Sequence, residues 1–170
     1  MTLYPFNEGL DLSGNPIEQA TSYTVGCALN LGASDLGREL RMPDRKVKAG
    51  ADFILTQPVY AAEAVDAVRR RLGGFPVPVL LGVLPLRSHR HAEFLHNEVP
   101  GMSVPEGVRE RIRLAGDMAQ QAGIEVCREL IREVQGDVAG AYSMAPLGRY
   151  DTVIQVLDGV TDLVAGAAKS

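Results

Sequence analysis

The sequence predicts an α/β fold built on a parallel sheet, and three observations lead to that prediction. Four near-continuous apolar runs bounded by Gly, Pro or Asn are typical of strands that are covered on both faces. Segments with helical periodicity separate these runs, and the strict alternation favours parallel strands with right-handed crossovers. The predicted strands are Thr21–Asn30, Ala51–Tyr60, Val77–Pro85 and Val138–Pro146.

Helical patterns fill the intervals between the predicted strands. Apolar residues at helical spacing predict a helix over Ala61–Leu72, and Ser88 is a suitable N-cap for a helix over Ser88–Val99. The stretch Pro105–Gln135 is long enough for two helices, with a break near Ala115–Gly123. A last apolar stripe consists of Val153, Leu157, Val160 and Val164.

The resulting order, β-α-β-α-β-α-α-β-α, fits two architectures: an open doubly wound sheet and part of a (β/α)8 barrel. No GxGxxG motif follows the first strand, so a dinucleotide-binding Rossmann unit is unsupported. The 170 residues predict a single domain, in which residues 1–19 form a loop rich in turn-forming types and residues 20–170 form four βα units.

Composition and charge exclude several classes of function. The net charge of −4 provides no basic field for nucleic acid or for an anionic membrane surface. The longest apolar runs are broken by Pro and Gly and are too short to span a membrane. Cys27 and Cys127 lack metal-ligand spacing and are interpreted as buried thiols, which suit a reducing cytoplasm.

Polar residues at the carboxyl ends of the predicted strands are candidates for binding, because active sites of parallel barrels lie at that end. Asn30 ends the first strand, where an amide suits either a ligand or an ordinary turn. Gln57 lies in an otherwise apolar strand, and a buried amide needs a partner, which is either a ligand or neighbouring backbone. Arg149 follows the last strand and suits either a ligand carboxylate or a pair with Asp151.

Two further groups are open to a functional or a purely structural interpretation. His89 and His91 follow the third strand, but without a third ligand at metal spacing they fit a solvated loop or helix start better than a metal site. Arg45 and Lys46 lie in the first crossover, where they face either phosphates or water. The sequence does not indicate a set of nucleophile and base for covalent catalysis.

Several of these segments together resemble the methylenetetrahydrofolate reductase family. The resemblance covers nearly the whole chain, and its specificity comes from the combination and order of the motifs. It is greatest to the bacterial form that is fused to a homocysteine S-methyltransferase domain. The matching pieces are ALN at 28–30, RKVKAGADFILTQPVY at 45–60, GVLPL at 82–86, AEFLHNEVPG at 92–101 and PLGRYDTVIQVLDG at 146–159.

The resemblance implies that the chain is the C-terminal half of a (β/α)8 barrel, with strands that match the fifth to eighth of the family. It also implies a flavoprotein of one-carbon metabolism and methionine biosynthesis, in which NAD(P)H reduces FAD. The reduced FAD converts 5,10-methylenetetrahydrofolate to 5-methyltetrahydrofolate. By position in the motifs, the implied FAD-binding residues are Asn30, Arg45 and Lys46, and the implied folate-binding residues are Gln57, His91 and Arg149.

The chain departs from the family pattern in two respects. The four preceding strands are missing, together with the glutamate that matches the family's general acid, whereas a whole barrel takes about 200 residues or more. We therefore assign no catalytic residue, and expect a homo-oligomer or a complementary N-terminal half-barrel to complete the sheet. Pro43 is the second departure, and it should break the helix that leads to Arg45 and Lys46.

Two alternatives to a reductase remain at this point. The first is a non-catalytic fragment that binds folate or flavin and needs a partner half-domain. The second is an unrelated aldolase or lyase barrel, which would need a Schiff-base lysine at a strand end or a Gly-rich phosphate loop after the last strands. Neither feature is found in the sequence.

Overall fold

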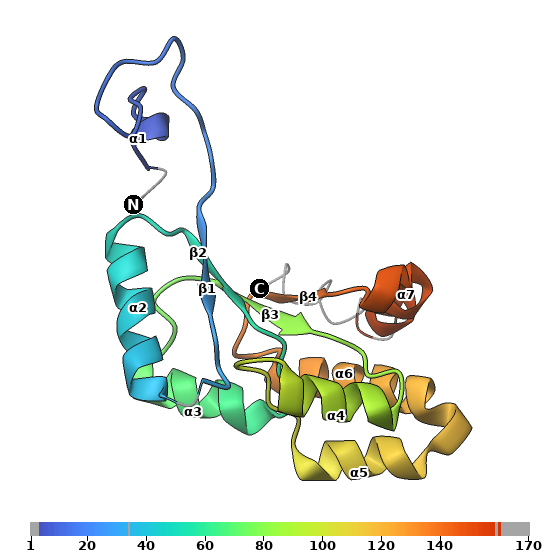
Figure 1. The fold of residues 1–170 in the computed structure, drawn as a ribbon. Helices are drawn as coiled ribbons and strands as arrows, with labels where there is room; N and C mark the ends of the chain where they lie inside the picture. The colour runs from blue at the N-terminus through green and yellow to red at the C-terminus, as the bar shows by residue number, and fades with distance from the viewer. Residues whose placement is uncertain (1–3, 34, 159, 161–170) are drawn as a thin grey trace.

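A computed structural model describes residues 4–33, 35–158 and 160, and within them it contains one four-stranded sheet (Figure 1). All neighbouring strands are parallel, and their order in space is their order in sequence. This confirms the predicted parallel sheet, although each strand is shorter than the apolar run that predicted it. The strands are β1 (Gly26–Leu29), β2 (Phe53–Thr56), β3 (Val79–Val83) and β4 (Gly140–Ser143).

Helices connect the strands, as the periodicity predicted. The long third crossover contains two helices with a break between them, which also agrees with the prediction. There α5 ends at Leu114 and α6 begins at Ala119, after the 3-10 turn η1 (Gly116–Met118). Gly123 therefore lies inside α6, and its role is close approach, because a Cβ there would clash with the backbone of Leu86. The helices are α1 (Tyr4–Asn7), α2 (Leu36–Lys48), α3 (Ala62–Leu72), α4 (His89–Glu98), α5 (Glu106–Leu114), α6 (Ala119–Val134) and α7 (Tyr150–Asp158), with a second 3-10 turn η2 (Pro146–Gly148).

Two expectations for the first part of the chain need correction. Residues up to 19 are mostly irregular, as predicted, but they include the single turn α1 and an isolated bridge between Leu10 and Pro16. Helix α2 runs without interruption past Pro43, so the predicted break is wrong. The helix loses one backbone donor there, while apolar residues on both sides of the proline, Leu36, Leu40 and Val47, pack against the core and hold the helix together.

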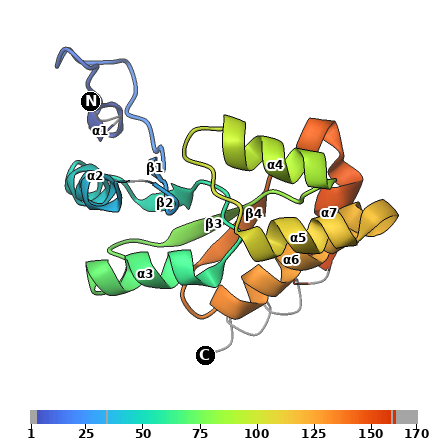
Figure 2. The same ribbon diagram turned by 60° about the horizontal axis from the view of Figure 1, so that its bottom comes forward.

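The core lies on one face of the sheet only. Burial alternates along β1 and β2, so that Leu29 and Ile54 are fully buried while their neighbours Ala28 and Leu55 are exposed or half-buried. The buried face packs against α3 and α6, and Figures 1 and 2 show α3, α4, α5 and α6 gathered on that side of the sheet. The apolar runs predicted strands covered on both faces, and the structure covers one. This arrangement confirms the predicted half-barrel, since the open face corresponds to a barrel interior.

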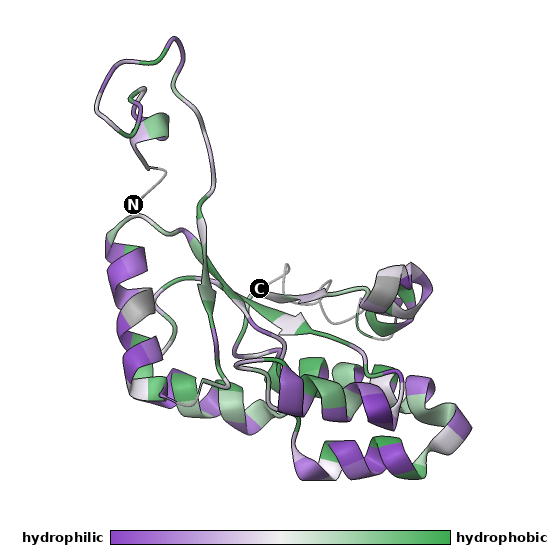
Figure 3. Cartoon of the chain, in the orientation of Figure 1, coloured by the Kyte–Doolittle hydropathy of each residue, from purple (hydrophilic) through white to green (hydrophobic). Residues whose placement is uncertain are grey.

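The last helix buries a different face from the one its apolar stripe predicted. Thr152 and Val156 are the fully buried residues of α7, whereas Leu157, a member of the predicted stripe, is 36% exposed. Val160 is buried as predicted, and Val164 lies outside the described residues. Strand residues are predominantly apolar in Figure 3, while α2 is largely hydrophilic. None of the described helices combines the length and the apolar character that crossing a membrane requires.

Candidate functional site

Four of the six candidate residues follow the carboxyl ends of strands, and parallel strands all finish at the same edge of the sheet. Asn30 follows β1, Gln57 follows β2, and Arg149 follows β4 after the turn η2. His91 lies in the first turn of α4, which follows β3. The site is therefore an edge on the open side of the sheet, assembled from four separate βα units.

Gln57 has a fixed backbone and an unoccupied side chain. Its N–H donates to the carbonyl of Leu29 at 2.9 Å, which continues the β1–β2 ladder by one residue. The residue is exposed, so the interpretation of a buried amide is wrong: the open face of the sheet leaves this position in solvent. Among the described residues none hydrogen-bonds to the side-chain amide. Because its backbone is fixed and its side-chain amide is free, Gln57 is well placed to bind a polar ligand.

Tyr142 is a member of this site that sequence reasoning missed. Its hydroxyl donates to the carbonyl of Thr56 at 2.6 Å, so the side chain of β4 crosses β3 to reach the end of β2. Gly82 of β3 makes this possible, because a Cβ there would lie 2.6 Å from the Thr56 oxygen and 2.9 Å from the Tyr142 hydroxyl. The signal was present in the sequence as a glycine in a central strand, which marks a close approach.

The hydroxyl and the carbonyl of Thr56 are thus both used across the sheet. Its hydroxyl accepts from the N–H of Gly82 at 2.8 Å, and its carbonyl accepts from Tyr142. Burial raises the pKa of the Tyr142 hydroxyl, which keeps the phenol protonated and able to donate at neutral pH. The peptide that joins Thr56 to Gln57 is consequently held by β1, β3 and β4 together.

Asn30 acts in the structure as a turn residue. Its side-chain oxygen accepts from the N–H of Gly32 at 2.9 Å, and its side-chain nitrogen lies close against Gly101. Gly101 has a φ of 78°, and a Cβ there would clash with that nitrogen. These contacts join the loop after β1 to the connection between α4 and α5. They engage the side-chain amide of Asn30, which was expected to contact FAD.

His91 takes part in the start of α4. Ser88 is the N-cap, since its hydroxyl accepts from the N–H of His91, and Nδ1 of His91 accepts from the N–H of Arg87 at 3.3 Å. Burial and then the nearby Arg87 guanidinium lower the pKa of this imidazole. The ring is therefore neutral at pH 7, with Nε2–H left as a donor. Among the described residues no group of three or more His, Cys, Asp or Glu could hold a metal ion.

Arg149 pairs with Asp151 in a two-bond ion pair. The distances are 3.0 Å from Nε to Oδ1 and 2.8 Å from Nη2 to Oδ2. The hydrogen bonds from Arg149 lower the pKa of Asp151, and those to Asp151 raise the pKa of Arg149. Because both side chains are about half exposed, water and other anions can reach the pair. A ligand carboxylate would present Arg149 with the same fork geometry that Asp151 offers now.

Arg45 and Lys46 come from the crossover helix α2 rather than from the end of a strand. A crossover helix runs back along its sheet, so the last turn of α2 points toward the amino end of the strands (Figure 1). Lys46 extends its ammonium to the carbonyl of Ala28 at 3.0 Å, and Arg45 is exposed. As folded, the Lys46 ammonium is bonded to Ala28 and the Asn30 side-chain oxygen to Gly32, so these residues do not by themselves form a flavin site.

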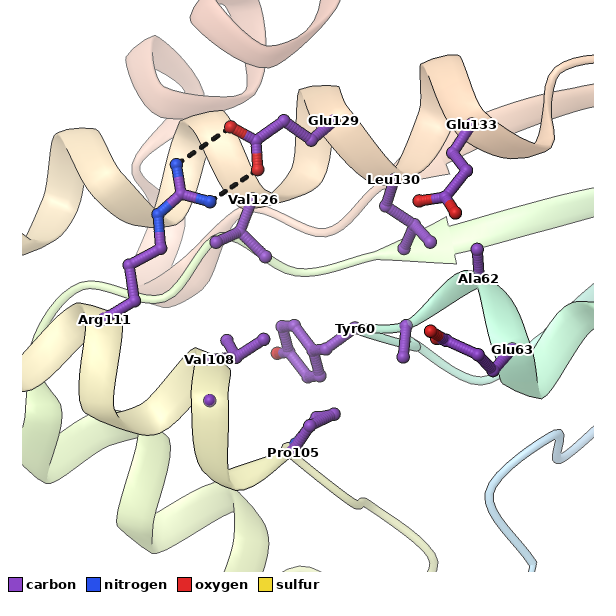
Figure 4. A pocket seen from close by; sticks show the side chains of 12 residues that line it. Tyr60, Ala62, Glu63, Pro105, Val108, Arg111, Val126, Glu129, Leu130 and Glu133 are labelled. Carbon is purple, nitrogen blue, oxygen red and sulfur yellow. Dashed lines mark hydrogen bonds and ion pairs between the residues drawn. The ribbon is translucent and has the colours of Figure 1, made fainter.

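A separate pocket of about 390 Å³ lies in the helical layer between α3, α5 and α6 (Figure 4). Tyr60 occupies its centre, with its hydroxyl bonded to the carbonyl of Leu84 at 3.0 Å. Arg111 and Glu129 close one side with a two-bond ion pair, one bond of which is 2.9 Å. None of the six candidate residues lines this pocket. Arg111 is thus already paired with Glu129, and the carboxylates of Glu63 and Glu133 also line the pocket.

The fold and the site define an α/β protein with the architecture of half a parallel barrel and a polar carboxyl edge. The family model for methylenetetrahydrofolate reductase matches residues 20–159, which include all four strands. The chain therefore belongs to the methylenetetrahydrofolate reductase family. This confirms the family that the motifs indicated.

Known relatives are longer than this chain. A methylenetetrahydrofolate reductase 2 of Schizosaccharomyces pombe is 27% identical over 112 residues, 61% of this chain and 17% of the relative. The methylenetetrahydrofolate reductase 2 of Saccharomyces cerevisiae is 27% identical over 115 residues, 62% of this chain and 19% of the relative. The chain thus spans less than a fifth of the length of either yeast protein.

A solved structure from Clostridium thermocellum shares the fold. It is the structure of an uncharacterized protein described as binding two copies of 5-methyl-5,6,7,8-tetrahydrofolic acid. The TM-score is 0.55 at 16% sequence identity, and the match covers 82% of this chain and 53% of that one. The similarity supports the fold, with this chain corresponding to about half of the larger protein.

Proposed function

We propose that this chain is the folate-binding half of a methylenetetrahydrofolate reductase-type domain. In the completed domain, NAD(P)H would reduce FAD, and FAD would reduce 5,10-methylenetetrahydrofolate to 5-methyltetrahydrofolate. The observation that carries the proposal is Gln57, fixed by its backbone at the carboxyl edge with a free amide facing the open side. Family membership supports it, as does the description of the Clostridium thermocellum protein as binding 5-methyltetrahydrofolic acid.

In this proposal three residues each contribute a polar contact to the ligand. The amide of Gln57 both donates and accepts, which matches the donor and acceptor edge of a pterin. Arg149 takes a carboxylate of the folate tail in exchange for Asp151, because guanidinium and carboxylate form paired bonds. His91, neutral and with Nε2–H available, is the third polar group at this edge.

The cofactor part of the proposal applies to the completed barrel. FAD would supply the hydride chemistry, and Asn30, Arg45 and Lys46 would contribute to its site only after rearrangement, since polar groups of Asn30 and Lys46 are bonded within the chain in this structure. The remaining strands come from a second copy of the chain or from a complementary half-barrel. Because the Gln57 amide is free while the polar groups of Asn30 and Lys46 are engaged, the second candidate function is folate binding without turnover.

Calorimetric titration of the purified chain with 5-methyltetrahydrofolate tests the proposal. We expect binding that weakens about tenfold or more in Arg149→Ala and in Gln57→Ala, since each removes a directed polar contact. Arg71→Ala, an exposed arginine at the end of α3, is the matched control and should bind as the wild type. Absence of binding, or equal affinity in all four proteins, would refute the folate assignment.

A second measurement separates the two candidate functions. The chain is mixed with FAD, NADH or NADPH and methylenetetrahydrofolate, and flavin reoxidation is followed. We expect no turnover from the chain alone, because general acid catalysis is worth about 10²–10⁴-fold and the family's matching acid lies on a strand outside this sequence. Folate binding without turnover, followed by turnover once the missing strands are supplied, supports the reductase. If no turnover appears even with the missing strands, the result favours folate binding without catalysis.

A further inference from the structure

The free edge of β1 presents two backbone groups that face away from the sheet. Successive residues of a strand direct their N–H and C=O groups to opposite sides. The carbonyl of Leu29 accepts from Gln57, so Leu29 faces β2. The C=O of Ala28 and the N–H of Asn30 therefore point to the other side, where the sheet has no neighbouring strand among the described residues.

Two side chains of α2 occupy these edge groups. Lys46 Nζ donates to the carbonyl of Ala28 at 3.0 Å, and the N–H of Asn30 donates to Glu39 Oε1 at 2.8 Å. Glu39 and Lys46 are seven residues apart, two helical turns, and so lie on the same face of α2. Between them they supply one donor and one acceptor at the strand edge.

A parallel strand would present the same pair of groups at this place. In a parallel ladder, a single residue of the incoming strand donates its N–H to the carbonyl of residue 28 and accepts the N–H of residue 30 with its own carbonyl. Glu39 and Lys46 thus substitute for one residue of a neighbouring strand. This is how natural sheets protect an edge that would otherwise pair freely.

We propose that the edge of β1 is the docking site for β4 of a second copy of this chain, and that Glu39 and Lys46 are the gate which that strand displaces. Two copies related by a twofold axis would place β1 of each beside β4 of the other. The proposed function leaves open which chain completes the barrel, and this inference names a second copy. It therefore rests on the completion of the barrel but not on the assignment of the ligand.

The strand count and the covering of the sheet support a second copy. Each chain has four parallel strands and helices on one face. Two such chains supply eight strands with all helices outside, which is the composition of a (β/α)8 barrel. The twofold arrangement uses both free edges of both copies, and the assembly is closed. The open face, with Leu55 and Leu80 half-buried on it, becomes the interior.

The helices at the two edges are complementary in charge. In a closed barrel α7 of one copy lies next to α2 of the other. Helix α2 has five basic residues and two acidic ones, whereas α7 has two acidic residues and no basic one. The basic residues of α2 are Arg38, Arg41, Arg45, Lys46 and Lys48, and the acidic residues of α7 are Asp151 and Asp158.

The same helix α7 carries an apolar stripe on its exposed side. Tyr150, Ile154 and Leu157 are 72%, 57% and 36% exposed, and their spacing places them on one face of the helix. Three large apolar side chains in a row on the surface mark a contact surface rather than a solvated face. In the proposed dimer this stripe packs on α2 of the second copy.

Sedimentation velocity from micromolar to near-millimolar concentration tests the proposal. The wild type should convert from a monomer of 18.2 kDa to a dimer. Opening the gate with Glu39→Met and Lys46→Met together should tighten the dimer about tenfold, because the incoming strand no longer displaces two hydrogen bonds. Ile154→Glu should abolish dimerisation in either background, and Leu114→Glu, which changes an even more exposed side chain on α5, should have no effect.

Three results would overturn the proposal. The first is a monomer over the whole range in both the wild type and the gate variant. The second is growth beyond the dimer, since open-ended pairing means that the barrel does not close. The third is a dimer that survives Ile154→Glu, because the interface then lies elsewhere. Ile154→Glu changes an exposed side chain in a chain with an intact gate, so it remains informative if the gate variant does not fold. None of these measurements involves folate, so the result is independent of the ligand assignment.

Discussion

The hydroxyl of Tyr142 in β4 donates to the carbonyl of Thr56 in β2 at 2.6 Å, across the intervening strand β3. The two strands are not neighbours in the sheet, so this bond links them through a side chain on the open face. Thr56 precedes Gln57, the residue on which the proposed ligand contact depends. The bond therefore connects the last strand of the chain with the geometry of the candidate site.

Tyr142→Phe should lower both stability and folate affinity. Loss of this hydrogen bond should reduce the free energy of unfolding by about 0.5–1.5 kcal/mol, measured by urea denaturation. If Tyr142 acts through Gln57, the variant should also weaken 5-methyltetrahydrofolate binding, and should do so much less in a Gln57→Ala background. Tyr23→Phe is the control, since Tyr23 is 57% exposed. Equal loss of affinity in both backgrounds would leave Tyr142 with a purely structural role.

Gly82→Ala and Gly107→Ala should change stability in opposite directions. A Cβ at Gly82 would lie 2.6 Å from the Thr56 oxygen and must displace backbone or Tyr142, a strain of about 1–3 kcal/mol. Nothing lies within 4 Å of a Cβ at Gly107 in α5, where alanine should stabilise by about 0.4–1 kcal/mol. Thermal unfolding of the two variants measures the difference. A Gly82→Ala protein as stable as the wild type would contradict the packing described for Tyr142.

Asp151→Asn should tighten folate binding if Arg149 binds the folate tail. The carboxylate of Asp151 occupies Arg149 through two bonds in the free chain. Asparagine removes the negative charge that competes with the ligand for Arg149, so the affinity for 5-methyltetrahydrofolate should rise severalfold. The same contact explains why Arg149→Ala should lower that affinity. Titration at low and high salt gives the readout, since the gain should shrink as salt screens the charges. Unchanged affinity would mean that the ligand does not exchange with Asp151.

Stability should fall at alkaline pH because Cys127 is buried. Desolvation raises the pKa of this thiol to about 12, above the value of about 8.5 for an unfolded cysteine. A raised folded pKa gives stability that is complete below about pH 8.5 and is lost as the pH rises toward 12, at about 1.4 kcal/mol per pH unit. Urea denaturation between those limits should show a shallower pH dependence in Cys127→Ala. Parallel slopes for the two proteins would show that the thiol does not titrate on unfolding.

The sequence was sufficient for the elements and their order. Apolar runs and Gly or Ser punctuation are local signals, which is why α3 ends at Gly73 and α4 starts after Ser88 as expected. Parallel pairing also followed from the alternation of elements alone. The family resemblance added the half-barrel, and the family model confirms the membership.

Contacts between distant segments could not be predicted in this way. Tyr142 and Thr56 are 86 residues apart, and only the folded sheet shows that Gly82 leaves the space between them. The basic pair at Arg45 and Lys46 suggested phosphates, but the direction of α2 carries Lys46 to the edge of β1. The roles of Asn30, Gln57, His91 and Arg149 toward a ligand remain predictions.

The open face of the sheet would link the stability of this chain to its concentration if the proposed dimer forms. If a second copy covers that face, folding and association become one equilibrium, and anything that binds only the folded chain stabilises it. The melting temperature should then rise with protein concentration in the wild type and stay constant in Ile154→Glu. A cell that makes little of this protein would hold a larger fraction of it unfolded, so the amount expressed would decide how much of it works.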